Sequence, residues 1–115
     1  TIQRLYEFGA LEVHMRPACP PLLYKCKFLN FSRSKSEFDL AARRAISQIE
    51  GKNTSDIGKY TKQGSDKYNQ MVEKIRQRLN LTSLKYQKMD DLVDAIGLPK
   101  NKLCTYCWDG EEPFA

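Results

Sequence analysis

Residues 11–16, LEVHMR, are a stretch in which apolar and polar side chains alternate strictly. Leu11, Val13 and Met15 would lie on one side of an extended chain, which predicts a β-strand with one buried face. A lone strand cannot satisfy its own backbone N–H and C=O groups, and its edges invite pairing. Because helical patterns fill most of the remaining sequence, we expect this strand to pair with chain outside these residues, where most of its sheet would lie.

The first half of the sequence predicts two helices around this strand. Residues 1–8 have the spacing of a short helix that Gly9 ends. Ser34 and Glu37 can form a capping box for a second helix, which Gly51 ends. The apolar stripe of this second helix consists of Phe38, Ala42, Ile46 and Ile49.

The second half predicts further helices. Ser65 can cap the first of them, whose apolar residues recur at helical spacing. These apolar residues are Tyr68, Met71, Val72, Ile75 and Leu79. Residues 82–86, TSLKY, are expected to be a short extended piece. A shorter helix over 89–96 ends at Gly97, and Pro99 fits the first turn of a last short helix.

Composition excludes little beyond a membrane protein. The chain has 115 residues, of which 41% are hydrophobic and 29% charged, as in an ordinary globular domain. No apolar run approaches the ~20 residues of a membrane helix, so no membrane partner is expected. The net charge of +5 permits contact with an anion. Basic and acidic residues are interspersed and no nucleic-acid-binding motif is present, so no nucleic-acid partner is expected.

Four cysteines fall into two groups. Cys19 and Cys26 lie in a proline-rich segment that excludes a helix, and Cys104 and Cys107 form a Cys-x2-Cys pair. Two thiolates at this spacing can converge on one metal ion, and distant cysteines can complete the ligand set. The spacing fits a zinc site, an iron–sulfur cluster or inert thiols. A thioredoxin-like redox pair is disfavoured, because that motif needs a helix N-terminus directly after a strand.

Several stretches, taken in order, resemble the C-terminal region of the amidophosphoribosyltransferases, which are glutamine phosphoribosylpyrophosphate amidotransferases. FGALEVHMR followed by PPLLYKCKF is similar to the helix, the E-V-H-x-R strand and the Ser-Pro-Pro-like segment that follow that family's phosphoribosylpyrophosphate loop. TSLKYQKMDDLVDAIGLPKNKLCTYCWDGEEPF is similar to its terminal pattern of Ser-Leu-x-Tyr, L-x-x-A-I-G and Cys-x2-Cys. The intervening residues, about 50–80, are longer and more basic than the family pattern.

The resemblance implies an α/β fold. Residues 1–33 would end a type I phosphoribosyltransferase domain, contributing one clear strand to its sheet, and residues 34–115 would form a mostly helical extension that ends in the Cys-x2-Cys tail. It also implies a cytoplasmic homo-oligomeric enzyme, which uses magnesium and transfers glutamine-derived ammonia to phosphoribosylpyrophosphate in the first committed step of de novo purine synthesis. The catalytic groups would lie in the remainder of the enzyme, so this segment alone should be inactive. His14, on the polar side of the strand, is expected to be structural or solvated.

The resemblance further implies two sites. Cys26, Cys104 and Cys107 match three ligands of a [4Fe-4S] cluster, whose fourth ligand would lie outside this chain. Cys19 matches a position that usually holds a small residue; it is either such a residue, which we favour, or a substitute ligand. Thr1 matches the last threonine of the phosphate loop and would bind the substrate's phosphate at a helix start.

The competing hypothesis is a small four-cysteine zinc-binding interaction domain, with Cys19 and Cys26 as its first pair. Ligand sulfurs lie roughly 6 Å apart around a cubane cluster and about 4 Å apart around one zinc ion. Either metal would hold the proline-rich segment against the C-terminal turn, where Trp108 could cover the sulfurs.

Overall fold

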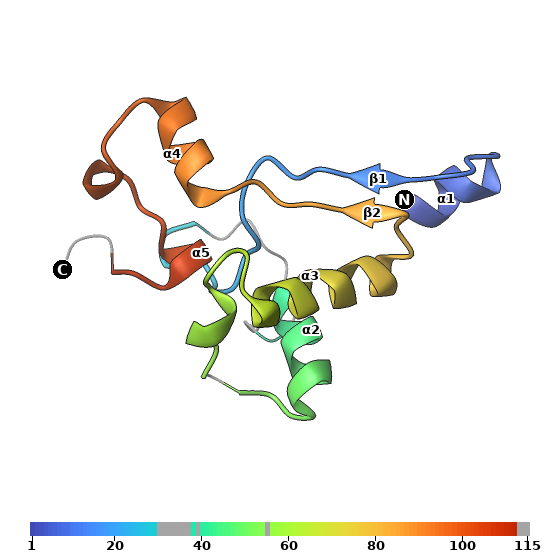
Figure 1. The fold of residues 1–115 in the computed structure, drawn as a ribbon, viewed down its shortest axis with the longest axis horizontal. Helices are drawn as coiled ribbons and strands as arrows, with labels where there is room; N and C mark the ends of the chain where they lie inside the picture. The colour runs from blue at the N-terminus through green and yellow to red at the C-terminus, as the bar shows by residue number, and fades with distance from the viewer. Residues whose placement is uncertain (30–37, 39, 55, 113–115) are drawn as a thin grey trace.

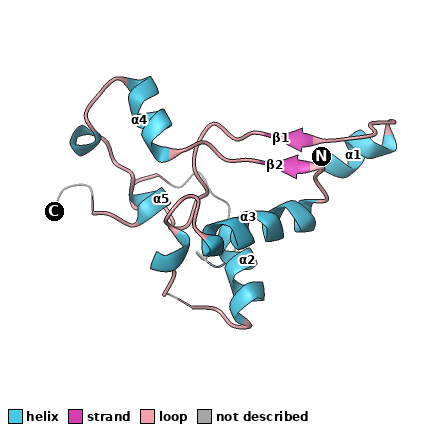
Figure 2. Cartoon of the chain, in the orientation of Figure 1, coloured by secondary structure: helices cyan, strands magenta, loops and turns pink. Residues whose placement is uncertain are grey.

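The computed structural model describes residues 1–29, 38, 40–54 and 56–112, and it shows an α/β chain with a two-stranded parallel sheet (Figures 1 and 2). Its elements are α1 (Ile2–Glu7), β1 (His14–Met15), α2 (Ala41–Glu50), η2 (Gly58–Tyr60), α3 (Asp66–Leu79), β2 (Ser83–Leu84), α4 (Met89–Ile96), η3 (Lys100–Lys102) and α5 (Tyr106–Asp109), where η denotes a 3₁₀ helix. Within these described ranges, no helix combines the length and the apolar character that crossing a bilayer requires.

The sheet joins two strands that lie far apart in the sequence. β1 runs parallel to β2, with Met15 opposite Leu84. Backbone hydrogen bonds extend the pairing at both ends, since Thr82 N–H donates to the carbonyl of Val13 (2.8 Å) and Lys85 N–H to that of Met15 (3.2 Å). The expectation that this strand pairs with chain outside these residues is therefore wrong for one of its edges. Parallel pairing between distant segments has no turn to mark it in the sequence.

β1 is shorter than the alternation predicted, and one of its edges is open. Its sheet has only β1 and β2 within the described residues, so β1 has one neighbour there. Val13 and Met15 are half-buried while His14 is exposed, so the predicted alternation is kept. Leu11, however, is 94% exposed, because this end of the chain packs against nothing in the described structure that would cover it.

The core lies between α2, α3 and η2, below the strands in Figure 1. Most apolar residues of the two predicted stripes face each other there, which confirms two amphipathic helices. Two residues of these stripes differ from the prediction, because Phe38 precedes α2 and Leu79 of α3 is 38% exposed. The buried cluster consists of Leu23, Ala42, Ala45, Ile46, Ile57, Tyr60, Met71 and Ile75. Leu23 belongs to the proline-rich segment, so this irregular loop is anchored in the core although its residues up to 29 form no helix or strand.

Most of the predicted helix ends are confirmed. The Ser65 hydroxyl accepts a hydrogen bond from Tyr68 N–H (3.2 Å) and caps α3. Gly51 and Gly97 end α2 and α4 with φ of 77° and 82°, a backbone conformation that glycine adopts without strain. Pro99 differs slightly from its predicted place, because it immediately precedes η3 instead of lying in its first turn.

The capping box predicted at Ser34 and Glu37 lies outside the described residues. α2 is described from Ala41, with Leu40 preceding it in an extended conformation.

α1 and α4 lie at the periphery and keep apolar side chains exposed. Neither helix contains a buried residue. Phe8, directly after α1, is 83% exposed, and Leu5 is 48% exposed. At the other side of the molecule, Ile96 of α4 and the following Leu98 are about half exposed (49% and 51%). These two helices therefore carry amphipathic patterns whose apolar sides the described chain does not cover.

Candidate functional site

The proline-rich loop docks onto the C-terminal turn through backbone hydrogen bonds. The N–H groups of Leu23 and Tyr24 both donate to the carbonyl of Cys107, at 2.8 and 3.1 Å. Cys107 lies in the one-turn helix α5, where a carbonyl has no later turn of helix to bond it. The loop amides supply the missing donors. We call this contact, between residues 22–27 and 104–112, the loop–tail joint.

Side-chain contacts also connect the two segments of the loop–tail joint. The rings of Tyr24 and Tyr106 lie 5.4 Å apart between centroids. Lys27 Nζ lies 4.4 Å from the centroid of the Tyr106 ring and forms an ion pair with Glu112, whose hydrogen bond raises the pKa of Lys27. Gly110 ends α5 with φ of 77°, and a Cβ atom added there would lie 2.7 Å from Cζ of Tyr24. The joint is therefore packed closely enough to require glycine at this position.

Two of the predicted ligands meet in the loop–tail joint. Cys26 and Cys107 line one small cavity of about 10 Å³. The Cys26 sulfur accepts hydrogen bonds from the N–H groups of Phe28 (3.4 Å) and Leu29 (3.3 Å). Cys104 is exposed at the start of the same turn.

Cys107 is affected both by its burial and by the other three thiols. Burial raises the pKa of Cys107 to about 11, and the neighbouring thiols of Cys26, Cys104 and Cys19 add to this effect. Without a bound cation, Cys107 is therefore protonated at neutral pH. No group of three or more His, Cys, Asp or Glu side chains within the described residues is placed to hold a single metal ion. The described geometry therefore supports neither the four-cysteine zinc hypothesis nor a metal site at Cys26, Cys104 and Cys107.

The helix α5 was not expected at the Cys-x2-Cys pair. It begins at Tyr106 and so contains Cys107, while Cys104 precedes it. The buried Thr105 hydroxyl donates to the carboxylate of Asp109 (2.8 Å), which fixes the turn. Neither cysteine follows a strand of the sheet, as the thioredoxin-like arrangement would require.

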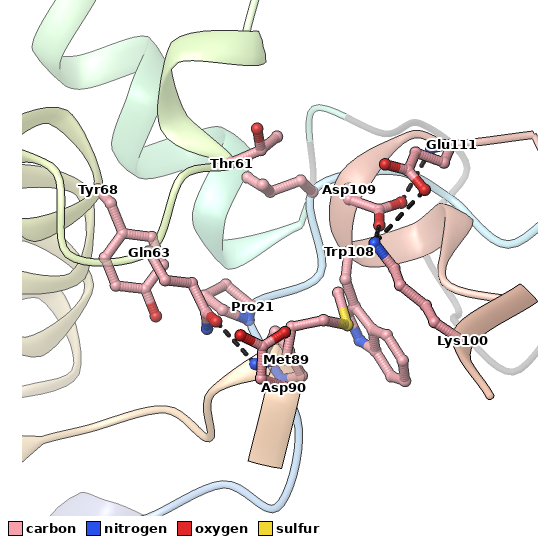
Figure 3. Close-up of a pocket in the computed structure, with 12 residues that line it drawn as sticks. Pro21, Thr61, Gln63, Tyr68, Met89, Asp90, Lys100, Trp108, Asp109 and Glu111 are labelled. Carbon is pink, nitrogen blue, oxygen red and sulfur yellow. Dashed lines mark hydrogen bonds and ion pairs between the residues drawn. The ribbon is translucent and has the colours of Figure 1, made fainter. Parts of the chain in front are cut away.

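A second cavity, of about 300 Å³, lies between the proline-rich loop, the start of α4 and α5 (Figure 3). Lys100 Nζ forms ion pairs across one side of it with Asp109 (3.4 Å) and Glu111 (3.5 Å). On the opposite side, the Gln63 side chain accepts a hydrogen bond from Met89 N–H (2.7 Å), the first amide of α4. No sequence motif marks this cavity, because its walls come from segments that are remote along the chain.

Trp108 lines this second cavity. It is absent from the walls of the small cavity that Cys26 and Cys107 share, so the described geometry does not support its expected role as a cover for those sulfurs. Its indole Nε1 is buried and has no hydrogen-bond partner among the described residues.

Thr1 and His14 lie far from the cysteines. Thr1 is exposed at the N-terminal end of α1, where its side chain makes no capping hydrogen bond, and Figure 1 shows this end opposite α5. His14 Nδ1 lies 2.6 Å from the Ser83 hydroxyl, and His14 Nε2 lies 3.8 Å from a carboxylate oxygen of Glu12. His14 thus links the two strands, in agreement with a structural role.

Sequence reasoning missed Arg43. This side chain is only 3% exposed, and its guanidinium donates to the carbonyls of Leu23 (2.9 Å) and Thr54 (3.1 Å). The signal was present in the sequence, because Arg43 precedes Ile46 by one helical turn and so lies beside the apolar stripe of α2.

Comparisons with known proteins find relatives that all carry the same protein name. The chain is 29% identical over 112 residues to an amidophosphoribosyltransferase of Methanothermobacter thermautotrophicus, an alignment that covers 97% of this chain and 18% of that protein. It is 26% identical to the amidophosphoribosyltransferases of Mycobacterium tuberculosis and Synechococcus elongatus, over 98% and 99% of this chain and 17% and 18% of theirs. The chain thus spans less than a fifth of the curated relatives it matches. These similarities confirm the resemblance stated from the sequence.

No protein-family model matches the sequence. No solved structure matches it either.

Proposed function

We propose that this chain, which is similar over nearly its whole length to amidophosphoribosyltransferases, is a C-terminal segment of such an enzyme. One observation carries the proposal: relatives of that name align with at least 97% of this chain but with less than a fifth of their own length. The alternative, a small zinc-binding domain, lacks support both from the relatives and from the thiol arrangement.

The proposed enzyme releases ammonia from glutamine and uses it, with magnesium, to displace pyrophosphate from phosphoribosylpyrophosphate, as the first committed step of de novo purine synthesis. It is cytoplasmic and homo-oligomeric. Residues 1–33 end its type I phosphoribosyltransferase domain. Residues 34–115 form its helical extension. Thr1 belongs to the phosphate-binding loop, and the catalytic residues lie in the remainder of the enzyme.

The remainder of the enzyme is the proposed partner of the exposed apolar side chains. Leu5, Phe8 and Leu11 belong to α1 and the segment that directly follows it, and all three are exposed. Full burial of a large apolar side chain under another part of the protein stabilises the folded protein by about 1.5–3 kcal/mol. Contact with the transferase domain would supply that burial.

Cys26, Cys104 and Cys107 are the proposed ligands of a [4Fe-4S] cluster, with a fourth ligand from the remainder of the enzyme. The support from the geometry is that Cys26 and Cys107 line one cavity, although Cys104 is not among its walls and no group of three ligands is assembled among the described residues. In a cubane each ligand sulfur binds a different iron, which requires wider spacing than a single ion does. When bound, the cluster would supply structural stabilisation or redox sensing. This chain's own contribution is the loop–tail joint, which holds both cysteine-bearing segments.

The activity is tested on the full-length polypeptide that contains these residues, purified without oxygen. We expect pyrophosphate release from phosphoribosylpyrophosphate with glutamine, and also with ammonia in place of glutamine. Failure to release pyrophosphate with either nitrogen source would contradict the proposed function.

The metal is tested separately by iron content and visible absorption. Cys26→Ser, Cys104→Ser and Cys107→Ser should each lower both quantities. Cys19→Ser is the matched control, and it should retain the iron and colour of the unsubstituted protein. A colourless protein that contains zinc would reject the cluster while leaving the transferase proposal standing.

A further inference from the structure

We propose that Arg43 is a positioning residue for the loop–tail joint. By holding the carbonyl of Leu23, it keeps the Cys26 segment at a fixed distance from Cys107. The consequence for a cluster rests on the proposed function, whereas the consequence for the distance between the two cysteines does not.

The contacts form a continuous connection from α2 to α5. Arg43 donates from one guanidinium nitrogen to the carbonyl of Leu23 (2.9 Å) and from another to the carbonyl of Thr54 (3.1 Å). Leu23 N–H in turn donates to the carbonyl of Cys107 (2.8 Å). Leu23 is therefore held from both sides, by the helical core through its C=O and by α5 through its N–H.

The surroundings of Arg43 suit a permanently charged side chain inside the core. The guanidinium carbon lies 5.1 Å from the ring centroid of Phe38 and 6.0 Å from that of Tyr24. Aromatic faces attract a cation at such distances, and the attraction offsets part of the cost of removing the charge from water. A guanidinium can also reach two carbonyls in different directions, which a lysine ammonium on its single stem does less well.

Loss of Arg43 should loosen the loop before it disturbs the helices. Leu23 is 1% exposed, so its carbonyl would lose its donor in a place that water does not readily enter. The loop can regain hydration only by moving outward, and this movement carries Cys26 with it. α2 would keep its contact with α3 through Ala42, Ala45 and Ile46, which lie in the buried cluster.

Three variants of the full-length protein test the inference. Arg43→Met keeps much of the side-chain volume but removes all donors, and Arg43→Lys keeps a charge and one donor group. Arg78→Met removes an exposed arginine of α3 and is the matched control. We expect Arg43→Met to lose its iron–sulfur absorption in air roughly tenfold faster than the unsubstituted protein, the range found for residues that orient metal ligands. Arg43→Lys should fall between the two, and Arg78→Met should match the unsubstituted protein.

A second measurement does not need the cluster. In iron-free protein that carries C19S and C104S, a short bifunctional thiol reagent should cross-link Cys26 to Cys107, as identified by peptide mass spectrometry. Arg43→Met should lower the cross-link yield severalfold while Arg78→Met leaves it unchanged. If the unsubstituted protein binds no iron and Arg43→Met still lowers the yield, the cluster proposal fails and the positioning role stands. If Arg43→Met leaves both the yield and any cluster loss rate unchanged, the positioning role is overturned. Should Arg43→Met fail to fold, Arg43→Lys decides by the same two measurements.

Discussion

Replacing Gly110 with alanine should open the loop–tail joint. Gly110 has φ of 77°, in the left-handed region that side-chain-bearing residues avoid. A Cβ atom there would lie 2.7 Å from Cζ of Tyr24, and 2.9 Å from both Cε2 and the hydroxyl oxygen. Moving the ring aside would disturb its contact with the Tyr106 ring.

The magnitude has two parts. Adopting the left-handed conformation costs an alanine about 1 kcal/mol. Forcing an extra carbon into a packed site costs typically 1–3 kcal/mol more. We therefore expect Gly110→Ala to destabilise the joint by about 2–4 kcal/mol in total.

Gly51→Ala separates these two parts. Gly51 ends α2 with the same φ of 77°, but a Cβ atom added there meets nothing within 4 Å. It should therefore cost about 1 kcal/mol, with no clash contribution. The difference between the two variants isolates the contact with Tyr24.

The assay is amide hydrogen exchange at Leu23 and Tyr24, whose N–H groups donate to the Cys107 carbonyl. Gly110→Ala should speed their exchange by about 10-fold or more, since 1.4 kcal/mol corresponds to a factor of 10. Gly51→Ala should leave these two amides much closer to the unsubstituted protein. Equal exchange at Leu23 and Tyr24 in the two variants would refute the argument that Gly110 is required by its contact with Tyr24.

Three further predictions concern activity, helix capping and pH. The purified 115-residue chain should release no pyrophosphate from phosphoribosylpyrophosphate and ammonia, and release above background would contradict its proposed place outside the catalytic machinery. Ser65→Ala should lower the free energy of unfolding by about 1 kcal/mol in urea titrations, because it removes the cap of α3, whereas Ser65→Asp should restore stability; no loss in the alanine variant would count against the cap. The hydrogen bonds from Lys59 and Tyr60 lower the pKa of Glu50 below its ordinary value of 4.5. The stabilisation from these bonds is therefore complete above pH 4.5 and is lost as the pH falls through the lowered pKa. Glu50→Gln should weaken the loss of folding stability in acid, and an unchanged loss would exclude this contribution.

Local patterns predicted the helices well. The stripe that begins with Tyr68 and the cap at Ser65 depend only on neighbours within one or two turns, and both are found in α3. The same is true of the glycines that end α2 and α4, because a left-handed residue is a local backbone requirement.

Contacts between distant segments were harder to predict. The pairing of β1 with β2 depends on the path of the chain through α2 and α3, which hydrophobic periodicity does not encode. Arg43 was overlooked for a related reason: its carbonyl partners, Leu23 and Thr54, lie in loops, and a backbone carbonyl has no residue-type signature. Cys26, Cys104 and Cys107 were expected to converge from the family resemblance; Cys26 and Cys107 line one cavity, but Cys104 is not among its walls.

The wide separation of β1 and β2 affects the order in which the chain can fold during synthesis. His14 of β1 precedes its neighbour Ser83 by 69 residues. At the usual translation rate of about 5–20 residues per second, β1 leaves the ribosome roughly 3–14 s before β2. Throughout this interval β1 lacks the strand that it pairs with in the described residues, and this edge of its backbone is open to mispairing with other nascent strands. The α2–α3 pair, which is complete before β2 emerges, can fold in the meantime and bring the end of α3 to the place where β2 must dock.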